Sequence, residues 1–333
     1  MKRVLLTGCA GFIGFHVGKR LLASGYEVLG IDNLNPFYNG GLKEARLAML
    51  HGRPGFQFIR ADITDLKVMD EISLQQEFGP IVHLAAQAGV RYSLENPHLY
   101  VQSNLVGFVN LIEVARKKQT PHFVYASSSS VYGANRKIPF AEIDNVDHPV
   151  SLYAATKKSA ELIAHAYAHL YGLPTTGLRF FTVYGPWGRP DMAVFKFCKA
   201  IYEGASIDIY NYGKMQRDFT YIDDIVEGIV RIIEKIPDST GHNGAVTNNS
   251  LARYKIYNIG NNQPVELGRL VGILESVIGK KAIIRWLPLQ PGDVPTTYAD
   301  IDRLSSCIGY RPKTPLDVGV ARFVEWYREY YKV

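Results

Sequence analysis

The sequence Arg3-Val-Leu-Leu-Thr-Gly8-Cys-Ala-Gly11-Phe-Ile-Gly14 joins a short apolar strand to a turn with glycines spaced as G-x-x-G-x-x-G. We expect a helix over residues 12–23, because Ser24-Gly25 would end it. Glycines let a backbone approach a pyrophosphate closely, and a helix start offers free N–H groups and the positive end of its dipole. This stretch therefore predicts a dinucleotide site at the first turn of an α/β fold.

A second strand, over residues 27–32, ends in Asp32, about 20 residues after the glycines. An acid at this position accepts hydrogen bonds from ribose hydroxyls and repels a 2′-phosphate. The sequence therefore favours NAD over NADP as the dinucleotide. The alternative is a glycine turn followed by an unrelated surface aspartate.

Strands and helices continue to alternate along the chain. Further strands are expected at residues 55–59, 80–86, 122–126 and 175–181, with helices at 98–118 and 151–172. Such alternation predicts a parallel sheet that binds ligands at the carboxyl ends of its strands. Turn residues at 182–189 end the alternation. Helices are then expected at 192–203, 266–278 and 315–331, with a Gly/Asn-rich loop at 239–250.

These elements predict an α/β protein, a Rossmann-type doubly wound parallel sheet with a smaller mixed α/β substrate-binding domain. A chain of 333 residues is large for one core. The NAD-binding domain is expected to comprise residues 1–180 and about 221–258, and the substrate-binding domain residues 181–220 and about 259–333. An amphipathic helix at 223–233 would return to pack on the larger domain.

Composition excludes several classes of protein. The hydrophobic fraction of 47% and the charged fraction of 20% are typical of a soluble globular protein, and no apolar run reaches membrane-spanning length. The N-terminus carries no signal-peptide pattern, and the three cysteines are few and far apart, so we expect a reducing cytoplasm and no metal site. The net charge of +6 is better explained by lysines dispersed over the surface than by binding of an anionic substrate or of nucleic acid, because the basic residues form no patch with interleaved aromatics.

Tyr153 and Lys157 lie four residues apart in the helix expected at 151–172, with Ser151 as a plausible N-cap and Gly172 as a plausible C-terminal glycine. This spacing places them on one face, where the ammonium can favour the phenolate and lower a pKa that is ordinarily about 10. A phenolate near neutral pH is a general base suited to an alcohol. The alternative is a solvated lysine beside a half-buried tyrosine.

Other polar or small residues stand at positions where a cofactor is expected. Asp62 and Ile63 follow the third strand and could meet an adenine, and small residues end the fourth strand. Asn104 interrupts an apolar helix, as either a helix-bridging hydrogen bonder or a cofactor contact. The serine run at 127–130 follows the fifth strand, at the expected ligand-binding edge.

In combination these motifs resemble the extended short-chain dehydrogenase/reductase family. The resemblance rests on the glycine turn, Asp32, the serine run before Val131-Tyr-Gly133, and the Tyr-x-x-x-Lys pair. It is extended by Arg179-Phe-Phe-Thr-Val-Tyr-Gly-Pro186, the segment 216–224 and Pro291-Gly-Asp293. More narrowly, the chain is similar to the nucleotide-sugar 4-epimerases and closest to the bacterial UDP-glucuronate 4-epimerases.

The resemblance implies a catalytic triad, an NAD cofactor, a UDP-sugar substrate and a homodimer built on two helices per subunit. From the composition we expect no nucleic acid or membrane partner. The catalytic residues would be Ser128, Tyr153 and Lys157. The cofactor-binding residues would be Gly8, Gly11, Phe12, Ile13, Gly14, Asp32, Asn33, Asp62, Ile63, Leu84, Ala85, Ala86, Asn104, Tyr153 and Lys157. The substrate-binding residues would be Gln87, Arg91, Ser128, Ser129, Ser130, Tyr153, Thr182, Arg189, Tyr210, Arg217 and Asp293.

One position departs from the related hexose epimerases, which often carry an arginine where this chain has Gln290. That difference leaves fewer charged contacts to the nucleotide.

The reaction implied is inversion at C4 of UDP-glucuronate to give UDP-galacturonate through a transient 4-keto sugar. Tyr153 would act as the base and Ser128 would relay the proton. A 4,6-dehydratase would need an acid and a base directly after the catalytic hydroxyl residue, where this chain has Ser129-Ser130. Three alternatives stay open: a UDP-glucose or UDP-N-acetylglucosamine 4-epimerase, a UDP-glucuronate decarboxylase, which usually carries a glutamate in that segment, and a non-catalytic NAD-binding regulator.

The C6 carboxylate of the substrate needs partners. Ser129, Ser130, Thr182 and Arg189 are candidates, since an arginine can bind a carboxylate bidentately and hydroxyls can fill the remaining lone pairs. Holding the carboxylate away from the perpendicular to the C4 carbonyl would also protect the keto intermediate from losing CO₂. The alternative is that Arg189 only caps a Gly/Pro turn.

Overall fold

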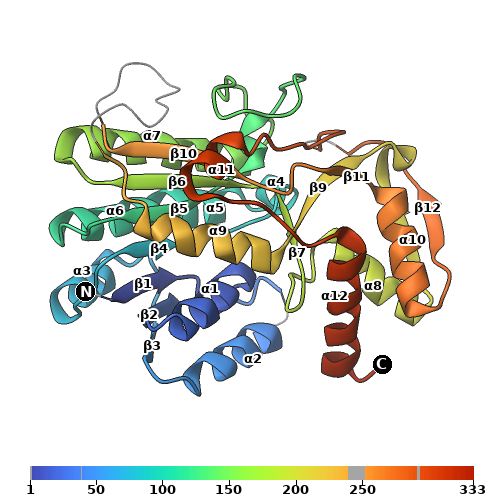
Figure 1. Ribbon diagram of the computed structural model, residues 1–333, viewed down its shortest axis with the longest axis horizontal. Coiled ribbons are helices and arrows are strands. Elements are labelled where there is room, and N and C mark those ends of the chain that lie inside the picture. The colour runs from blue at the N-terminus through green and yellow to red at the C-terminus, as the bar shows by residue number, and fades with distance from the viewer. Residues whose placement is uncertain (1, 39, 239–251, 291–292) are drawn as a thin grey trace.

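The computed structural model describes residues 2–38, 40–238, 252–290 and 293–333. Its largest element is a parallel seven-stranded sheet in the order β10-β6-β5-β4-β1-β2-β3 (Figure 1). The strands are β1 Arg3–Thr7, β2 Glu27–Asp32, β3 Phe56–Arg60, β4 Ile81–His83, β5 Phe123–Ser128, β6 Thr175–Phe180 and β10 Tyr254–Ile259. The chain reverses direction across the sheet between β1 and β4, and their carboxyl ends therefore form the switch point where such folds bind ligands.

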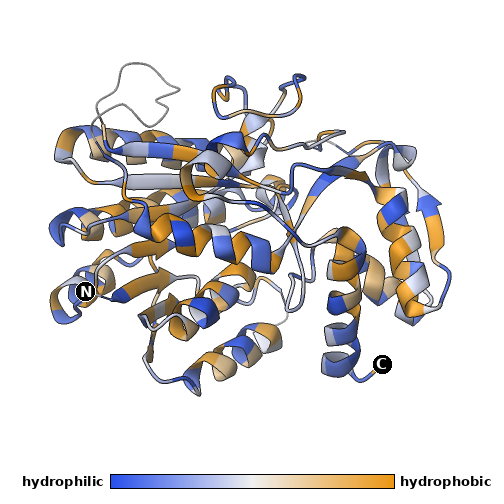
Figure 2. Cartoon of the chain, viewed as in Figure 1, coloured by the Kyte–Doolittle hydropathy of each residue, from blue (hydrophilic) through white to orange (hydrophobic). Residues whose placement is uncertain are grey.

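Helices cover both faces of this sheet, because alternate strand residues point to opposite sides. Val4 and Leu6 belong to one core and Leu5 to the other. The helices are α1 Phe12–Ala23, α2 Gly40–His51 and α9 Ile222–Glu234 on the first face, and α3 Leu66–Gln75, α6 Gly107–Lys117 and α7 Leu152–Tyr171 on the second. In Figure 2 strand β1 is largely hydrophobic, and helices α1 and α9 carry both hydrophobic and hydrophilic stretches.

The smaller unit lies beyond the carboxyl edge of the sheet. It contains a three-stranded sheet in the order β11-β9-β7 and a two-stranded sheet of β12 and β8. Its elements are β7 Thr182–Tyr184, α8 Ala193–Glu203, β8 Ser206–Ile209, β9 Gln216–Tyr221, β11 Pro264–Glu266, α10 Leu267–Ile278, β12 Ile283–Trp286 and α12 Leu316–Tyr331. Helix α11 Asp302–Ile308 packs instead on β10 and α9 of the larger unit. The predicted fold class, a Rossmann-type sheet with a smaller mixed α/β unit, is confirmed. The residue boundaries of the two domains stay a prediction.

The helix that carries Tyr153 begins and ends where the sequence indicates. Ser151 Oγ accepts a hydrogen bond from the backbone N of Ala154 at 3.1 Å, and Gly172 closes the helix with a φ of 64°. The predicted return of α9 is also observed, since Arg20 of α1 pairs with Glu227 of α9 at 3.0 Å. Helices α8, α10 and α12 match their predicted ranges within one residue.

Other expectations need revision. The helix expected at 98–118 is α5 Pro97–Val101 joined to α6 by a π-helical turn, Gln102–Val106. The loop expected at 239–250 lies outside the described residues. Helix α2 had no counterpart among the predicted elements. Within the described part of the chain, no helix has both the length and the apolar character needed to cross a membrane.

Candidate active site

A cavity of about 940 Å³ is lined by residues at the carboxyl ends of the strands of the large sheet and by residues of the smaller unit. This volume is at the upper end of the range typical for ligand sites. Residues from both units line it, from Gly8 and Asp32 at one end to Tyr210 and Asp293 at the other. The cavity is therefore long enough to contact two ligands in sequence, a cofactor on the sheet and a substrate under the smaller unit.

The glycine turn packs too tightly for any side chain. Gly11 N donates to Gly8 O at 2.9 Å, and Gly8 has a φ of +72°. A Cβ at Gly14 would lie 2.0 Å from Gly8 O, and one at Gly8 would lie 2.7 Å from Ala85 N. Helix α1 starts directly after Gly11, which has no side chain to cap the first N–H groups, so these donors stay available to a phosphate. The turn fits the pyrophosphate of a dinucleotide.

Asp32 closes the ribose end of the same cradle. Its carboxylate accepts hydrogen bonds from Ala10 N at 3.2 Å and Leu34 N at 2.8 Å, and Lys43 lies 3.6 Å away. Asn33 donates to Asp62 at 2.8 Å. Burial raises the pKa of the Asp62 carboxyl, but hydrogen bonds from Thr64 and Asn33 outweigh burial and leave that pKa below its ordinary value. Both acids are thus fixed as hydrogen-bond acceptors where an adenosine would lie.

Tyr153, Lys157 and Ser128 converge on the middle of the cavity. The Lys157 ammonium lies 5.9 Å from the centre of the Tyr153 ring and donates to Ala126 O at 2.9 Å. Burial lowers the pKa of Lys157 to about 8. Burial also raises the pKa of Tyr153, and a hydrogen bond with Ser128 and the positive charge of Arg189 oppose that rise only in part.

This result corrects the expectation that Lys157 lowers the pKa of Tyr153. With a pKa of about 8, Lys157 is only partly charged in weakly alkaline solution, and desolvation of the phenolate dominates in the chain alone. The position of the pair on one face of α7 is as predicted.

A buried ion pair fixes the serine run against α7. Arg179 and Glu161 form a bidentate pair with both N···O distances at 2.9 Å, and Ser127 Oγ donates to Glu161 at 2.6 Å. Ser128 follows directly, and its Oγ accepts from Ser130 N at 3.2 Å. Glu161 is eight residues after Tyr153 on the same helix face, and that spacing is the signal in the sequence that could have identified it.

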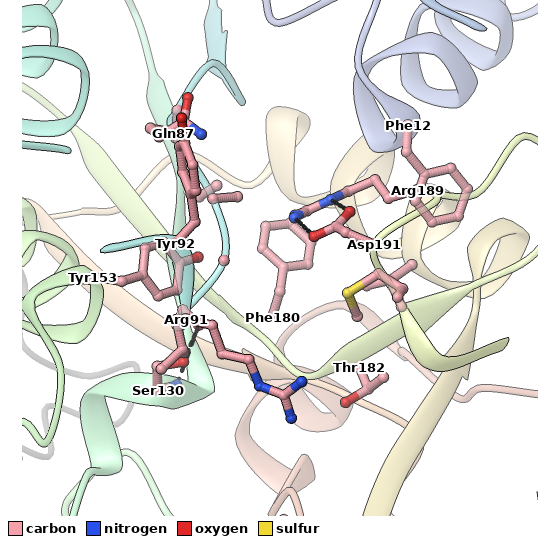
Figure 3. A pocket seen from close by; sticks show the side chains of 18 of the residues that line it. Phe12, Gln87, Arg91, Tyr92, Ser130, Tyr153, Phe180, Thr182, Arg189 and Asp191 are labelled. Carbon is pink, nitrogen blue, oxygen red and sulfur yellow. Dashed lines mark hydrogen bonds and ion pairs between the residues drawn. The ribbon is translucent and has the colours of Figure 1, made fainter. Parts of the chain in front are cut away.

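Arg189 does not stand free in the cavity. Its guanidinium forms a bidentate ion pair with Asp191, with Nε 3.0 Å from Oδ1. In Figure 3 this pair lies between Phe12 and Phe180, apart from Ser130 and Thr182. The role predicted for Arg189 as a carboxylate ligand therefore requires it to leave Asp191 or to bind while paired. No spacing rule in the sequence indicated Asp191.

At the other end of the cavity, Arg91, Tyr210 and Asp293 lie together. Arg91 pairs with Asp293 at 3.0 Å and stacks over the Tyr210 ring at 4.6 Å. Arg217 donates to the carbonyl oxygens of Gln216 and Pro295 at 2.9 and 3.1 Å, and burial lowers its pKa. The fold brings these residues from separate segments to one end of the cavity, and their contacts with a substrate stay a prediction.

Nearly all the predicted site residues line this cavity, and Asn104 is the exception. Its amide donates to Gln87 O at 3.0 Å and to Thr156 Oγ1 at 3.1 Å, and its oxygen accepts from Gln87 N at 2.8 Å. Asn104 thus lies behind the wall and ties the Gln87 segment to α7, which is the helix-bridging alternative. Sequence reasoning missed Lys43, Asp191 and Lys196, which also line the cavity.

The glycine turn, the ribose-side acid and the Ser/Tyr/Lys group at the carboxyl edge of a Rossmann sheet together define an extended short-chain dehydrogenase/reductase. A model of the NAD dependent epimerase/dehydratase family matches residues 4–260. The chain belongs to that family.

Several known proteins are similar to this chain over nearly its whole length. The chain is 53% identical over 334 residues to protein CapI of Staphylococcus aureus, covering 99% of both chains. It is 52% identical to a probable UDP-glucuronate 4-epimerase of Rhizobium meliloti (strain 1021), covering 99% of this chain and 98% of the relative. The solved UDP-glucuronic acid 4-epimerase of Bacillus cereus, in complex with UDP-glucuronic acid and NAD, is 33% identical with a TM-score of 0.88, covering 99% of this chain and 100% of that one.

Proposed function

We propose that this protein is an NAD-dependent UDP-glucuronate 4-epimerase, an isomerase that inverts C4 of UDP-glucuronate to give UDP-galacturonate through a transient 4-keto sugar. One observation carries the reaction type. The Ser128, Tyr153 and Lys157 group faces the cavity, and the positions directly after Ser128 hold Ser129 and Ser130, which cannot act as an acid and a base at neutral pH. The match to relatives named UDP-glucuronate 4-epimerase supports the substrate.

Each residue of the group has a proposed part. The glycine cradle would hold NAD⁺, whose nicotinamide would supply a reversible hydride acceptor for C4 of the sugar. Tyr153 Oη takes the proton of the C4 hydroxyl and later gives it back to the C4 oxygen. Ser128 Oγ hydrogen-bonds that same oxygen, while Lys157, anchored on Ala126 O, keeps a positive charge beside the phenol. The cavity volume of about 940 Å³ leaves room for the sugar ring to turn over between the two transfers.

The substrate would lie from the middle of the cavity to its far end. Tyr210, Arg217 and Asp293 would hold the uridine diphosphate, with Arg91 fixing Asp293. Ser129, Ser130 and Thr182 would donate hydrogen bonds to the C6 carboxylate. Arg189 would lie beside that carboxylate, held in place by its ion pair with Asp191. The hydroxyls are thus the direct carboxylate ligands of this proposal.

The remaining alternatives differ in product. A UDP-glucose or UDP-N-acetylglucosamine 4-epimerase would turn over the neutral sugar faster than the acid. A decarboxylase would release UDP-xylose and CO₂, and a regulator would bind NAD without turnover. All three are distinguishable with the same purified protein.

We also propose a cytoplasmic homodimer. Helices α6 and α7 carry exposed apolar side chains, among them Val109, Leu162 and Leu170. A pair of such helices from each of two subunits would bury these side chains in a four-helix contact. Light scattering on the purified protein tests the dimer, and a mass of one 37.3 kDa chain would contradict it.

The direct test is to add UDP-glucuronate to the purified protein and follow the sugar signals by NMR. UDP-galacturonate should accumulate to an equilibrium mixture without added reductant. Matched reactions with UDP-glucose and UDP-N-acetylglucosamine should be slower by at least about tenfold, a difference of about 1.4 kcal/mol in transition-state binding. Accumulation of UDP-xylose, or faster turnover of a neutral sugar, would replace the proposal with the corresponding alternative.

A further inference from the structure

Arg46 of α2 is a fully buried cation without an acidic partner. Its side chain is 0% exposed, and among residues 2–38, 40–238, 252–290 and 293–333 no carboxylate lies within ion-pair distance of it. Its guanidinium donates instead to Ala10 O at 3.0 Å, Tyr38 Oη at 3.0 Å, and Trp187 O at 2.6 Å. Removing a charge from water without a counter-charge is costly. A hydrophobic side chain of similar length would fill this part of the core without the desolvation cost of a charge. The buried guanidinium therefore indicates a role beyond packing.

The oxygens that Arg46 binds belong to segments far apart in sequence. Ala10 lies inside the glycine turn, and its N–H donates to Asp32. Trp187 and Gly188 lie 141 and 142 residues after Arg46, in the turn that follows β7. Arg46 therefore joins the dinucleotide cradle directly to that turn, beside a second contact in which His16 Nε2 of α1 is hydrogen-bonded to Pro186 O at 2.9 Å.

The turn after β7 is held in a conformation that it would not adopt unaided. Trp187 has a φ of +64°, a left-handed value that a bulky side chain rarely takes. Its ring packs at centroid distances of 5.7 Å from Phe15, 5.3 Å from Trp326 and 5.1 Å from Tyr330. The aromatic contacts fix the side chain, while Arg46 fixes the carbonyl, so both are needed to define the backbone there.

Two residues later the chain places Arg189 in the cavity, where its charge acts on Tyr153. We propose that Arg46 is a positioning residue that holds the Trp187–Gly188 backbone and thereby sets where the Arg189–Asp191 pair stands relative to the reacting C4 oxygen at Tyr153. The proposal rests on the proposed function, in which Tyr153 is the base for that oxygen. It differs from a role in core stability because it predicts effects that pass through Arg189.

The pH dependence of turnover provides one such effect. Tyr153 is faced by Lys157 of its own helix, Ser128 of β5, Tyr100 of α5, and Arg189 with Asp191 from the turn. The positive charge of Arg189 lowers the pKa of Tyr153. A base works when deprotonated, so turnover rises with pH through this pKa. Displacing Arg189 raises the pKa and moves the rising limb of the kcat profile to higher pH.

The experiment compares Arg46→Met, Arg46→Lys, Arg189→Met and the double variant Arg46→Met/Arg189→Met, each purified with its NAD content and melting temperature measured. Arg46→Met should lower kcat by about tenfold to 100-fold, the effect of a misplacement on the order of 1 Å, and shift the rising limb upward. In the Arg189→Met background the same substitution should change kcat less than about twofold. Arg46→Lys should recover part of the activity, because an ammonium still donates to a carbonyl. Arg20→Met, which removes an exposed cation on α1, is the matched control and should leave kcat and the pH profile unchanged.

Hydrogen–deuterium exchange tests the positioning step without turnover. Amides of residues 185–191 should exchange at least about tenfold faster in Arg46→Met, or in Arg46→Lys if the first variant does not fold, while the amides of β1 stay protected. Unchanged exchange at 185–191 overturns the proposal whatever the activity. Multiplicative losses in the double variant, or a kcat loss that only follows NAD content, overturn it as well. A wild-type protein that fails to epimerise UDP-glucuronate refutes the proposed function instead, and the exchange result then still decides whether Arg46 holds the turn.

Discussion

The buried pair of Arg179 and Glu161 gives the sharpest stability prediction. The two side chains are 4% and 3% exposed and joined by two hydrogen bonds of 2.9 Å. Glu161→Gln keeps the shape of the side chain but leaves the Arg179 charge without a counter-charge in the core. Breaking such a pair typically costs about 3–5 kcal/mol, and we take about 3 kcal/mol because the new amide oxygen still accepts one hydrogen bond. At roughly 2 °C per kcal/mol for a large domain, the melting temperature should fall by about 6 °C.

Thermal unfolding by circular dichroism measures this change, with two comparison variants. Glu227→Gln removes the acid that pairs with Arg20 and Arg231, side chains that are all 37–48% exposed, and it should cost no more than about 1 kcal/mol. The double variant Arg179→Met/Glu161→Met leaves no isolated charge, so it should be more stable than Glu161→Gln alone. A Glu161→Gln protein that melts within about 1 °C of wild type, or a double variant less stable than the single one, would refute the reasoning.

Three further predictions concern the active site. Tyr153→Phe should fold and retain NAD but lose about 10²–10⁴-fold in epimerisation measured by NMR, and near-normal turnover would remove Tyr153 as the base. Gly14→Ala should purify without NAD, because the added Cβ would lie 2.0 Å from Gly8 O, whereas Gly272→Ala, with nothing within 4 Å, should retain it; chromatography of released nucleotide decides between them. The folded-state pKa of Lys157 is lowered to about 8 from 10.5, so between those values the unfolded chain binds more protons. Stability relative to Lys157→Met should therefore rise with pH across that window, by up to about 1.4 kcal/mol per pH unit, and a flat difference in denaturant titrations would contradict the lowered pKa.

The part of the fold that the sequence predicted is the part governed by local rules. The first strand, the glycine turn and α1 follow from hydrophobic period and turn chemistry within about 25 residues, and the bounds of α1 are as expected. The caps of α7 follow from Ser151 and Gly172 in the same way. The predicted site residues that line the cavity were assigned by motif through the resemblance, and several of those motifs, such as the glycine turn and the serine run, lie at the carboxyl ends of strands.

What the sequence did not predict depends on contacts between distant segments. Helix α2 was missed, although Leu42, Leu47 and Leu50 are buried on one side of it, and Arg46 meets Trp187 only in the folded chain. Asp191 was missed because a carboxylate two residues from an arginine carries no spacing signal. The pKa of Tyr153 was predicted in the wrong direction for the chain alone, since helical spacing reports the distance to Lys157 but says nothing of how completely the pair is desolvated.

The distribution of charge along the cavity bears on how an acid sugar would be chosen over a neutral one. Arg189 is ion-paired with Asp191 and Arg91 with Asp293, whereas for Arg217 the described residues provide two carbonyl oxygens and no carboxylate within ion-pair distance. Of the three arginines that line the cavity within the described part of the chain, the one without a paired acid thus lies at the end proposed for the nucleotide, where a diphosphate of either substrate would meet it equally. Preference for a C6 carboxylate would then depend on neutral donors such as Ser129, Ser130 and Thr182. Hydroxyl donors that bind a carboxylate oxygen lose more binding free energy, when that oxygen is replaced by a hydroxymethyl group, than a distant positive charge would.

Selectivity for UDP-glucuronate should accordingly be insensitive to salt, since hydrogen bonds at short range are screened far less than separated charges. A kcat/KM ratio of the acid to UDP-glucose that falls steeply between low and high ionic strength would instead assign the selectivity to the charge of Arg189.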